Sequence, residues 1–194
     1  LFADKTVANN KAVTISGLTL SGEDAGNYTV TDNSGATANI TAKAITSTGI
    51  TASNKVYNAN TVATLNTGTA VLTGGAVADD DNKYYTGDTV TLDTSGAAGL
   101  FADKTVANNK AVTISGLALS GADAGNYTVT DASNATANIT AKPITATGVT
   151  AVNKIYNANT VATLNTGLAA ITAGATADDD KKYYDGDTVI LEKA

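Results

Sequence analysis

The chain repeats itself, and this repetition limits its fold more than any other feature. Residues 1–95 and 100–194 match at 75 of 95 positions, at a constant offset of 99 residues. Where the copies differ, apolar residues replace apolar ones, as in Val56 and Ile155, whereas solvent-type positions such as Glu23 and Ala122 change freely. Packing therefore constrains the copies more than surface chemistry does, and the repetition predicts an array of similar folded units.

The only proline indicates where one unit ends. Lys142 and Pro143, followed by Gly148, are typical of an extended connection between units. We therefore expect three segments, which are the C-terminal half of a unit at 1–43, one complete unit at 44–142 and the N-terminal half of the next unit at 143–194. The alternative boundary, "TSGAAG" at 94–99, is better interpreted as a hairpin loop.

Half a unit is too short to bury a core of its own, because even a 60-residue domain is marginal. Placed head to tail, residues 143–194 and 1–43 would rebuild a unit that lacks only the equivalents of 96–99. Either the chain is a window cut from a longer array, or neighbouring chains complete each other's halves in a filament.

Composition and alternation together predict the fold class. The 34 threonines favour strands and the 18 glycines favour turns. Asn9 and Asn10 predict a tight hairpin, and the segment 21–28 predicts one helical turn capped by Ser21 or Asp24. Alternating apolar residues predict short strands, each with a copy 99 residues later, at 12–16, 28–31, 36–41, 69–73 and 88–92. We expect an all-β protein of tandem, small sandwich-like modules in an elongated array.

Several classes of chemistry are absent from the composition. The chain has no His or Cys, and all twelve basic residues are lysines, so it offers no Ser–His–Asp triad, thiol nucleophile or zinc site. A net charge of −6 disfavours binding to nucleic acid. No apolar run approaches the length that spans a bilayer, so we expect no membrane insertion.

A specific motif carries a resemblance to a known family. The segment 101–145 contains "FADKTVANNKAVTISGLALSGADAGNYTVT" and then "ITAKPIT", and it resembles the second half of the YDG-type repeats of large bacterial surface exoproteins, the filamentous-haemagglutinin-like adhesins. The motif that names these repeats appears at 55–60 and 154–159 with Asn-Ala in place of Asp-Gly. The resemblance implies an extracellular, tandemly repeated β-module in a stalk or fibre, without enzymatic activity.

Two acidic runs are candidate calcium sites. Clustered aspartates on a glycine-containing loop can supply several of the oxygens that Ca²⁺ requires. The alternative is a solvated loop, because alternate residues of an extended segment point in opposite directions. Asp185 accompanies the second run, and the candidate ligands are Asp79, Asp80, Asp81, Asp88, Asp178, Asp179, Asp180 and Asp187.

Three further motifs have both a functional and a structural interpretation. In "SGADAGNYTV", Asp123 and Asn126 bind either a ligand or the local backbone, with unusual dihedral angles at Gly121 and Gly125 and with Tyr127 packed inward. A Lys–Asn crosslink would need two of Lys5, Lys11, Lys55 and Asn27 in an apolar site. The pairs Tyr84-Tyr85 and Tyr183-Tyr184 either stack on sugars or place one ring inward and one outward.

The function that these observations favour is mechanical. We expect structural repeat modules in the stalk or fibre of a secreted or cell-surface bacterial adhesin, with no cofactor except calcium at the acidic runs. The expected partners are adjacent repeat units of the same or neighbouring chains and a host or matrix ligand. Two alternatives remain open at this point: a subunit of a self-assembling filament and a glycan-binding adhesin module.

Overall fold

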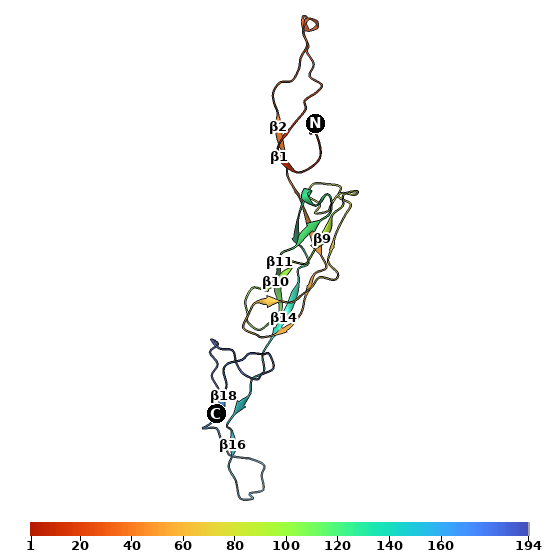
Figure 1. Cartoon of the computed structure of the whole chain (residues 1–194). Coiled ribbons are helices and arrows are strands. Elements are labelled where there is room, and N and C mark those ends of the chain that lie inside the picture. Colours follow the sequence, from red (N-terminus) through yellow and green to blue (C-terminus); the bar gives the residue numbers. More distant parts are fainter. Residues whose placement is uncertain (194) are drawn as a thin grey trace. The chain divides into compact units, whose positions relative to one another are not determined.

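The computed structural model describes residues 1–193 and is nearly all β (Figure 1), which confirms the prediction of an all-β protein. The described chain divides into two units. The first unit comprises residues 1–50, 67–97 and 114–133, and the second comprises 51–66, 98–113 and the chain from 134 onward. Among the described residues, no helix is long and apolar enough to cross a membrane.

The first unit contains three small sheets. Its central strand is β3 (Lys43–Thr48), which pairs in parallel with β13 (Tyr127–Asp131) and antiparallel with β8 (Val71–Leu72). Two antiparallel pairs complete the unit, namely β1 (Ala8–Ala12) with β2 (Thr37–Ile40), and β9 (Thr91–Asp93) with β12 (Ala118–Ser120). Alternate residues of β3 point inward, so Ile45 and Ser47 are buried, together with Ile50 and Tyr127.

The second unit is built on a five-stranded sheet. Its strand order is β5 (Lys55–Val56), β14 (Thr136–Thr140), β11 (Ala107–Ser115), β10 (Ala98–Phe101) and β6 (Val62–Ala63). Three two-stranded pairs join it: β4 (Thr51–Ala52) with β7 (Leu65–Asn66), β15 (Ala146–Thr147) with β18 (Ala170–Ile171), and β16 (Thr150–Ala151) with β17 (Leu164–Asn165). Phe101, Val112 and Ile139 are the largest buried side chains of this unit.

The Asn-Asn pair forms a β-bulge, so the predicted tight hairpin at Asn9-Asn10 is wrong. The pair lies inside the continuous strand β1, whose register against β2 shifts between Ala8 and Lys11. Asn10 has φ 53°, a left-handed conformation that asparagine tolerates well, and its N–H donates to Asn39 Oδ1 at 2.8 Å. The second copy has the same bulge at Asn109.

Three strand pairings occur in both copies with an unchanged register. They are β1–β2 with β11–β14, β3–β8 with β15–β18, and β4–β7 with β16–β17. Four pairings occur once in the described chain, namely β13–β3 and β12–β9 in the first unit and β14–β5 and β10–β6 in the second. The repeated pairings join residues 13 to 32 positions apart, whereas the single ones join residues 25 to 84 positions apart.

Three strand predictions hold in one copy only. Residues 111–115 lie in β11, whereas at 12–16 the strand β1 ends at Ala12 and only an isolated bridge follows at Val13. Residues 127–131 form β13, but the predicted strand at 28–31 is not one of the strands in the described chain. The predicted strand at 88–92 corresponds to β9, whose copy at 190–192 has no strand either. The segment 94–99 is not a hairpin loop as predicted, because β9 pairs with β12 and β10 with β6; the Ala97 N–H donates to Thr94 O in a simple turn.

Candidate functional site

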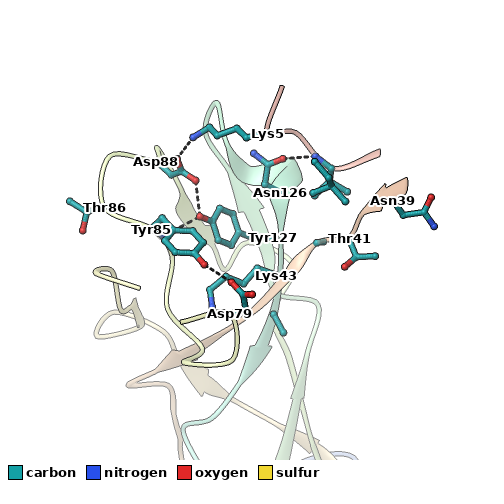
Figure 2. A pocket seen from close by; sticks show the side chains of 14 residues that line it. Lys5, Asn39, Thr41, Lys43, Asp79, Tyr85, Thr86, Asp88, Asn126 and Tyr127 are labelled. Atoms are coloured by element: carbon teal, nitrogen blue, oxygen red, sulfur yellow. Dashed lines mark hydrogen bonds and ion pairs between the residues drawn. The ribbon is translucent and has the colours of Figure 1, made fainter. Parts of the chain in front are cut away.

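A pocket of about 620 Å³ lies in the first unit (Figure 2). Asp88 is one of the residues that line it, and we call this pocket the Asp88 site. Lys5 and Tyr127 both reach the carboxylate of Asp88, which has only 10% of its side chain exposed. Lys5 belongs to the N-terminal segment, whereas Tyr127 begins β13. The Asp88 site therefore joins three segments that are distant in sequence.

Each oxygen of Asp88 has its own donor. Lys5 Nζ lies 2.6 Å from Oδ1, and the Tyr127 hydroxyl donates to Oδ2 at 2.7 Å. Both hydrogen bonds lower the pKa of Asp88, and the bond from Lys5 has the larger effect. The same ion pair raises the pKa of Lys5. The Tyr127 hydroxyl also accepts the Tyr85 N–H at 3.1 Å, and burial raises the pKa of Tyr127.

A second ion pair supports the same pocket. Lys43 Nζ lies 3.0 Å from Asp81 Oδ1 and 5.5 Å from the centre of the Tyr85 ring. Asp81 also accepts hydrogen bonds from three backbone N–H groups. These bonds hold its pKa far below the usual range, and the bond from Val77 has the largest effect. The Tyr85 hydroxyl donates to Asp79 Oδ1 at 2.8 Å, which raises the pKa of Tyr85 (Figure 2).

The second unit contains a similar arrangement around Asp187, which we call the Asp187 site, with a tyrosine from a different motif. Lys104 Nζ lies 2.8 Å from Asp187 Oδ1, as Lys5 does from Asp88. The hydroxyl donor is here Tyr57, at 3.0 Å from Oδ1 and 2.8 Å from Oδ2, and its ring meets the Tyr184 ring edge to face at 6.0 Å. Lys104 and then Tyr57 lower the pKa of Asp187.

The supporting ion pair recurs as well. Lys142 Nζ lies 2.9 Å from Asp180 Oδ1 and 5.3 Å from the centre of the Tyr184 ring. Asp180 accepts three backbone N–H groups, and its bond to Lys142 is the main reason why its pKa lies far below the usual range. The Tyr184 hydroxyl donates to Asp178 Oδ1 at 3.0 Å, so both copies share this contact too.

The two sites hold their groups in ordinary charge states. The pKa values of Asp88 and Asp187 are lowered and those of Lys5 and Lys104 are raised, so these groups are carboxylates and ammonium ions at neutral pH. A general base or an amine nucleophile requires a pKa that moves toward neutrality, which is the opposite direction. The arrangement is better suited to linking distant segments of the chain than to proton transfer.

In the second copy of the "DAGNY" motif, the aspartate and asparagine side chains contact distant segments. Asp123 Oδ2 accepts the Thr89 N–H at 2.9 Å, and Asn126 Oδ1 accepts the Val7 N–H at 3.0 Å. The local hydrogen bonds predicted for these two side chains are therefore wrong, although the predicted inward packing of Tyr127 is confirmed. The predicted helical turn is present as two short 3₁₀ helices, Ala25–Asn27 and Ala124–Asn126, without a side-chain cap.

The glycines of this motif behave differently from each other. Gly121 has φ +109°, and a Cβ there would lie 2.3 Å from Thr89 O, so the residue allows both the turn and the close approach of the backbone. Gly125, for which unusual dihedral angles are also predicted, is not among the described glycines with positive φ.

The predicted calcium ligands are distributed over separate partners. Asp81 and Asp180 pair with Lys43 and Lys142, and Asp88 and Asp187 pair with Lys5 and Lys104. Asp79 and Asp178 accept from tyrosines, whereas Asp80, Asp179 and Asp185 are exposed. Among residues 1–193, no three acidic side chains converge as a metal site would require. Calcium binding stays a prediction from the sequence.

The remaining candidates have structural partners. Of the predicted crosslink lysines, Lys5 binds Asp88, Lys11 binds Asp4, and Lys55 donates to Asn60 Oδ1 at 3.0 Å. Burial lowers the pKa of Lys55. Of the paired tyrosines, Tyr84 pairs its backbone with Gly74 and Tyr85 lies beside Lys43. The sequence analysis does not identify the role of Lys104. A sequence feature that could have revealed it is the spacing of 83 residues between lysine and aspartate, which is the same in both ion pairs.

Comparison with known proteins gives one match. A family model described as the YDG domain matches residues 1–36 and 41–136, which is more than half of the chain. Neither a curated protein nor a solved structure matches the chain.

Proposed function

Because the chain belongs to the YDG-domain family, we propose that it is a structural repeat module of the stalk or fibre of a bacterial surface protein. In this proposal the chain is extracellular, carries no catalytic site and adds length to a larger adhesin. Its partners are adjacent units of the same kind and, at the end of the stalk, a host or matrix ligand.

One observation carries the proposal. Both copies form the same three strand pairings with the same registers, including the bulge at Asn10 and Asn109. A chain that repeats its backbone structure with its sequence is built from interchangeable parts, which is the property that a tandem stalk requires. The charged groups of the Asp88 and Asp187 sites are paired with each other, which supports the same conclusion, since neither site offers a group poised for catalysis.

Surface labelling tests the location that we propose. An antibody raised against the purified chain should label intact bacterial cells that produce the protein, and brief protease treatment of those cells should remove the label. A cytoplasmic protein released by lysis serves as the control and should remain unlabelled. Label that appears only after the cells are broken open would contradict the proposal.

A further inference from the structure

The Lys5–Asp88 ion pair crosses a predicted boundary between repeat units. The sequence predicts that one unit ends at residue 43, and the match to the family model is interrupted between residues 36 and 41, close to this position. Lys5 lies before the boundary and Asp88 lies after it, although both belong to the first compact unit (Figure 2). The ion pair therefore connects residues of two successive repeats.

The second predicted boundary, at residue 142, is crossed by the equivalent pair. Lys104 lies before this boundary and Asp187 lies after it, and both belong to the second compact unit. Tyr57, which also precedes the boundary, donates to Asp187 Oδ2 at 2.8 Å. At the first boundary the tyrosine donor lies on the same side as the aspartate, so the lysine is the donor that crosses the boundary in both copies.

Strand pairing does not reinforce these connections in the part of the chain that the structure describes. Residues 1–42 form strand pairings only with each other, and the same is true of residues 143–193. Pro143, the first residue after the second boundary, has no N–H that could join a strand ladder. Side-chain contacts such as those of Asp88 and Asp187 therefore hold the joint between repeats, because backbone pairing across it is missing.

The loop that carries the aspartate changes between the copies, but the ion pair does not. The spacing from lysine to aspartate is 83 residues in both copies. Two residues before the aspartate, however, Thr86 in the first copy corresponds to Asp185 in the second, and both residues are exposed. Asp185 forms no ion pair within residues 1–193, so it is a matched control for Asp187.

We propose that this lysine–aspartate pair fixes each repeat against the next, and that the joint between them becomes mobile when the pair is broken. The side chains of Lys5 and Lys104 are 72% and 45% exposed, so either ammonium can move away without opening a core. The aspartates are far less exposed, and each keeps a tyrosine donor when its lysine leaves. Contacts of this kind open locally, at a lower free energy than the unfolding of the strands on either side.

The inference deepens the proposed function, since it states how successive units of a stalk are held, and it rests on the repeat-module part of that proposal. It does not depend on where the protein is located. Surface labelling that failed would overturn the location and leave the joint untouched, whereas the measurements below test the joint alone.

Distance measurements between two spin labels test the inference at the second boundary. The chain has no cysteine, so Thr113→Cys and Ala162→Cys introduce two labelling sites, both exposed and one on each side of residue 142. Double electron–electron resonance then gives the distribution of distances between the labels. We expect Asp187→Ala to widen this distribution, because the lysine and the tyrosine that cross the boundary both lose their acceptor.

Asp185→Ala is the matched control. It removes a carboxylate from the same loop without removing an ion pair, so it should leave the distribution of distances unchanged. Far-UV circular dichroism at the temperature of the measurement should show that the strands remain folded in both variants. Widening in Asp187→Ala without loss of strand signal is the result that the proposal requires.

A charge swap separates the ion pair from a merely structural role of the aspartate. Lys104→Asp should widen the distribution by repulsion, and the addition of Asp187→Lys should narrow it again. This arm decides the question if Asp187→Ala does not fold, because Lys104 lies at the surface. The inference is overturned by a distribution that stays narrow in Asp187→Ala, by equal widening in Asp185→Ala, or by a swap that restores nothing.

Discussion

Tyr127 donates its hydroxyl hydrogen to Asp88 at 2.7 Å, and this bond links the start of β13 to a loop 39 residues earlier in the chain. The same aspartate binds Lys5, so one carboxylate connects three segments of the first unit. Because the tyrosine is buried and the carboxylate has little contact with water, the loss of either partner leaves a polar group without a substitute.

Tyr127→Phe should therefore destabilise the protein. Removing the hydroxyl leaves Asp88 short of one donor and the Tyr85 N–H short of one acceptor, which costs about 1–3 kcal/mol. The urea midpoint measures the effect. The control is Tyr28→Phe, since that side chain is exposed and its loss of a hydroxyl should change the midpoint little. Equal effects of the two variants would show that the Asp88 contact is unimportant.

Acid should weaken the contacts that Asp88 and Asp187 make with their lysine and tyrosine partners. The pKa values of Asp88 and Asp187 are lowered in the folded protein, so their contribution to the free energy of unfolding is complete above the ordinary aspartate pKa of about 3.9. It is lost as the pH falls through the lower folded-state pKa. We expect the urea midpoint to fall steadily below about pH 4.

The double variant Asp88→Asn, Asp187→Asn isolates this contribution. It should be less stable than the wild type at pH 7 and should lose less stability in acid, although Asp81 and Asp180, whose pKa values are also lowered, keep part of the slope. Parallel pH profiles of the variant and the wild type would contradict the prediction.

Ser47→Ala should stabilise the protein. Ser47 is fully buried in β3 and its hydroxyl has no hydrogen-bond partner, so its removal relieves a desolvation cost of about 1 kcal/mol or more. The second copy has alanine at this position, Ala146, where the side chain is exposed. Ala146→Ser is therefore the control and should be neutral in a thermal melt, whereas a lower melting temperature for Ser47→Ala would refute the argument.

Gly121→Ala and Gly22→Ala should differ in their cost. Both glycines have positive φ, but a Cβ at Gly121 would lie 2.3 Å from Thr89 O, and a Cβ at Gly22 would meet nothing within 4 Å. The Gly22 variant should lose only the backbone strain, about 1 kcal/mol, while the Gly121 variant should lose more because the backbone must move. Denaturation of the two variants in parallel measures the difference, and equal losses would mean that the contact relaxes freely.

Adding calcium tests the predicted metal site against the ion pairs that the structure shows at the acidic runs. Ligation by the acidic runs would raise the melting temperature when calcium is added to protein treated with a chelator. Because Lys43 and Lys142 already serve as counter-ions to Asp81 and Asp180, we expect no change. A rise that depends on calcium concentration and disappears in the Asp81→Asn, Asp180→Asn variant would establish the metal site instead.

Local features of the fold could be predicted from the sequence, and long-range ones could not. Alternation at 36–41 predicts β2 correctly, because that pattern is read from neighbouring residues. The identical patterns at 28–31 and 127–130 end in different structures, since only the second has β3 as a neighbour. The Asn-Asn pair signals positive φ correctly, but whether the result is a hairpin or a bulge depends on Asn39, which is 29 residues away from Asn10.

The candidate site was predicted only in its parts. The acidic runs and the "DAGNY" motif are visible as unusual residues, and Tyr127 was expected to pack inward. Their partners are not visible, because Lys5 and Val7 lie 83 and 119 residues from Asp88 and Asn126. Nothing local to a lysine on an exposed segment distinguishes it from any other solubilising charge.

The bulged β1–β2 hairpin has a consequence for how near-identical copies avoid exchanging strands during folding. Its two strands lie about 30 residues apart, and the Asn39 amide fixes their alignment at the bulge. A competing strand from the other copy is 99 residues further along the chain, so the correct partner meets its mate across the shorter loop. The first hairpin can thus close before its duplicate leaves the ribosome, so its strands are already paired when the second pair is made.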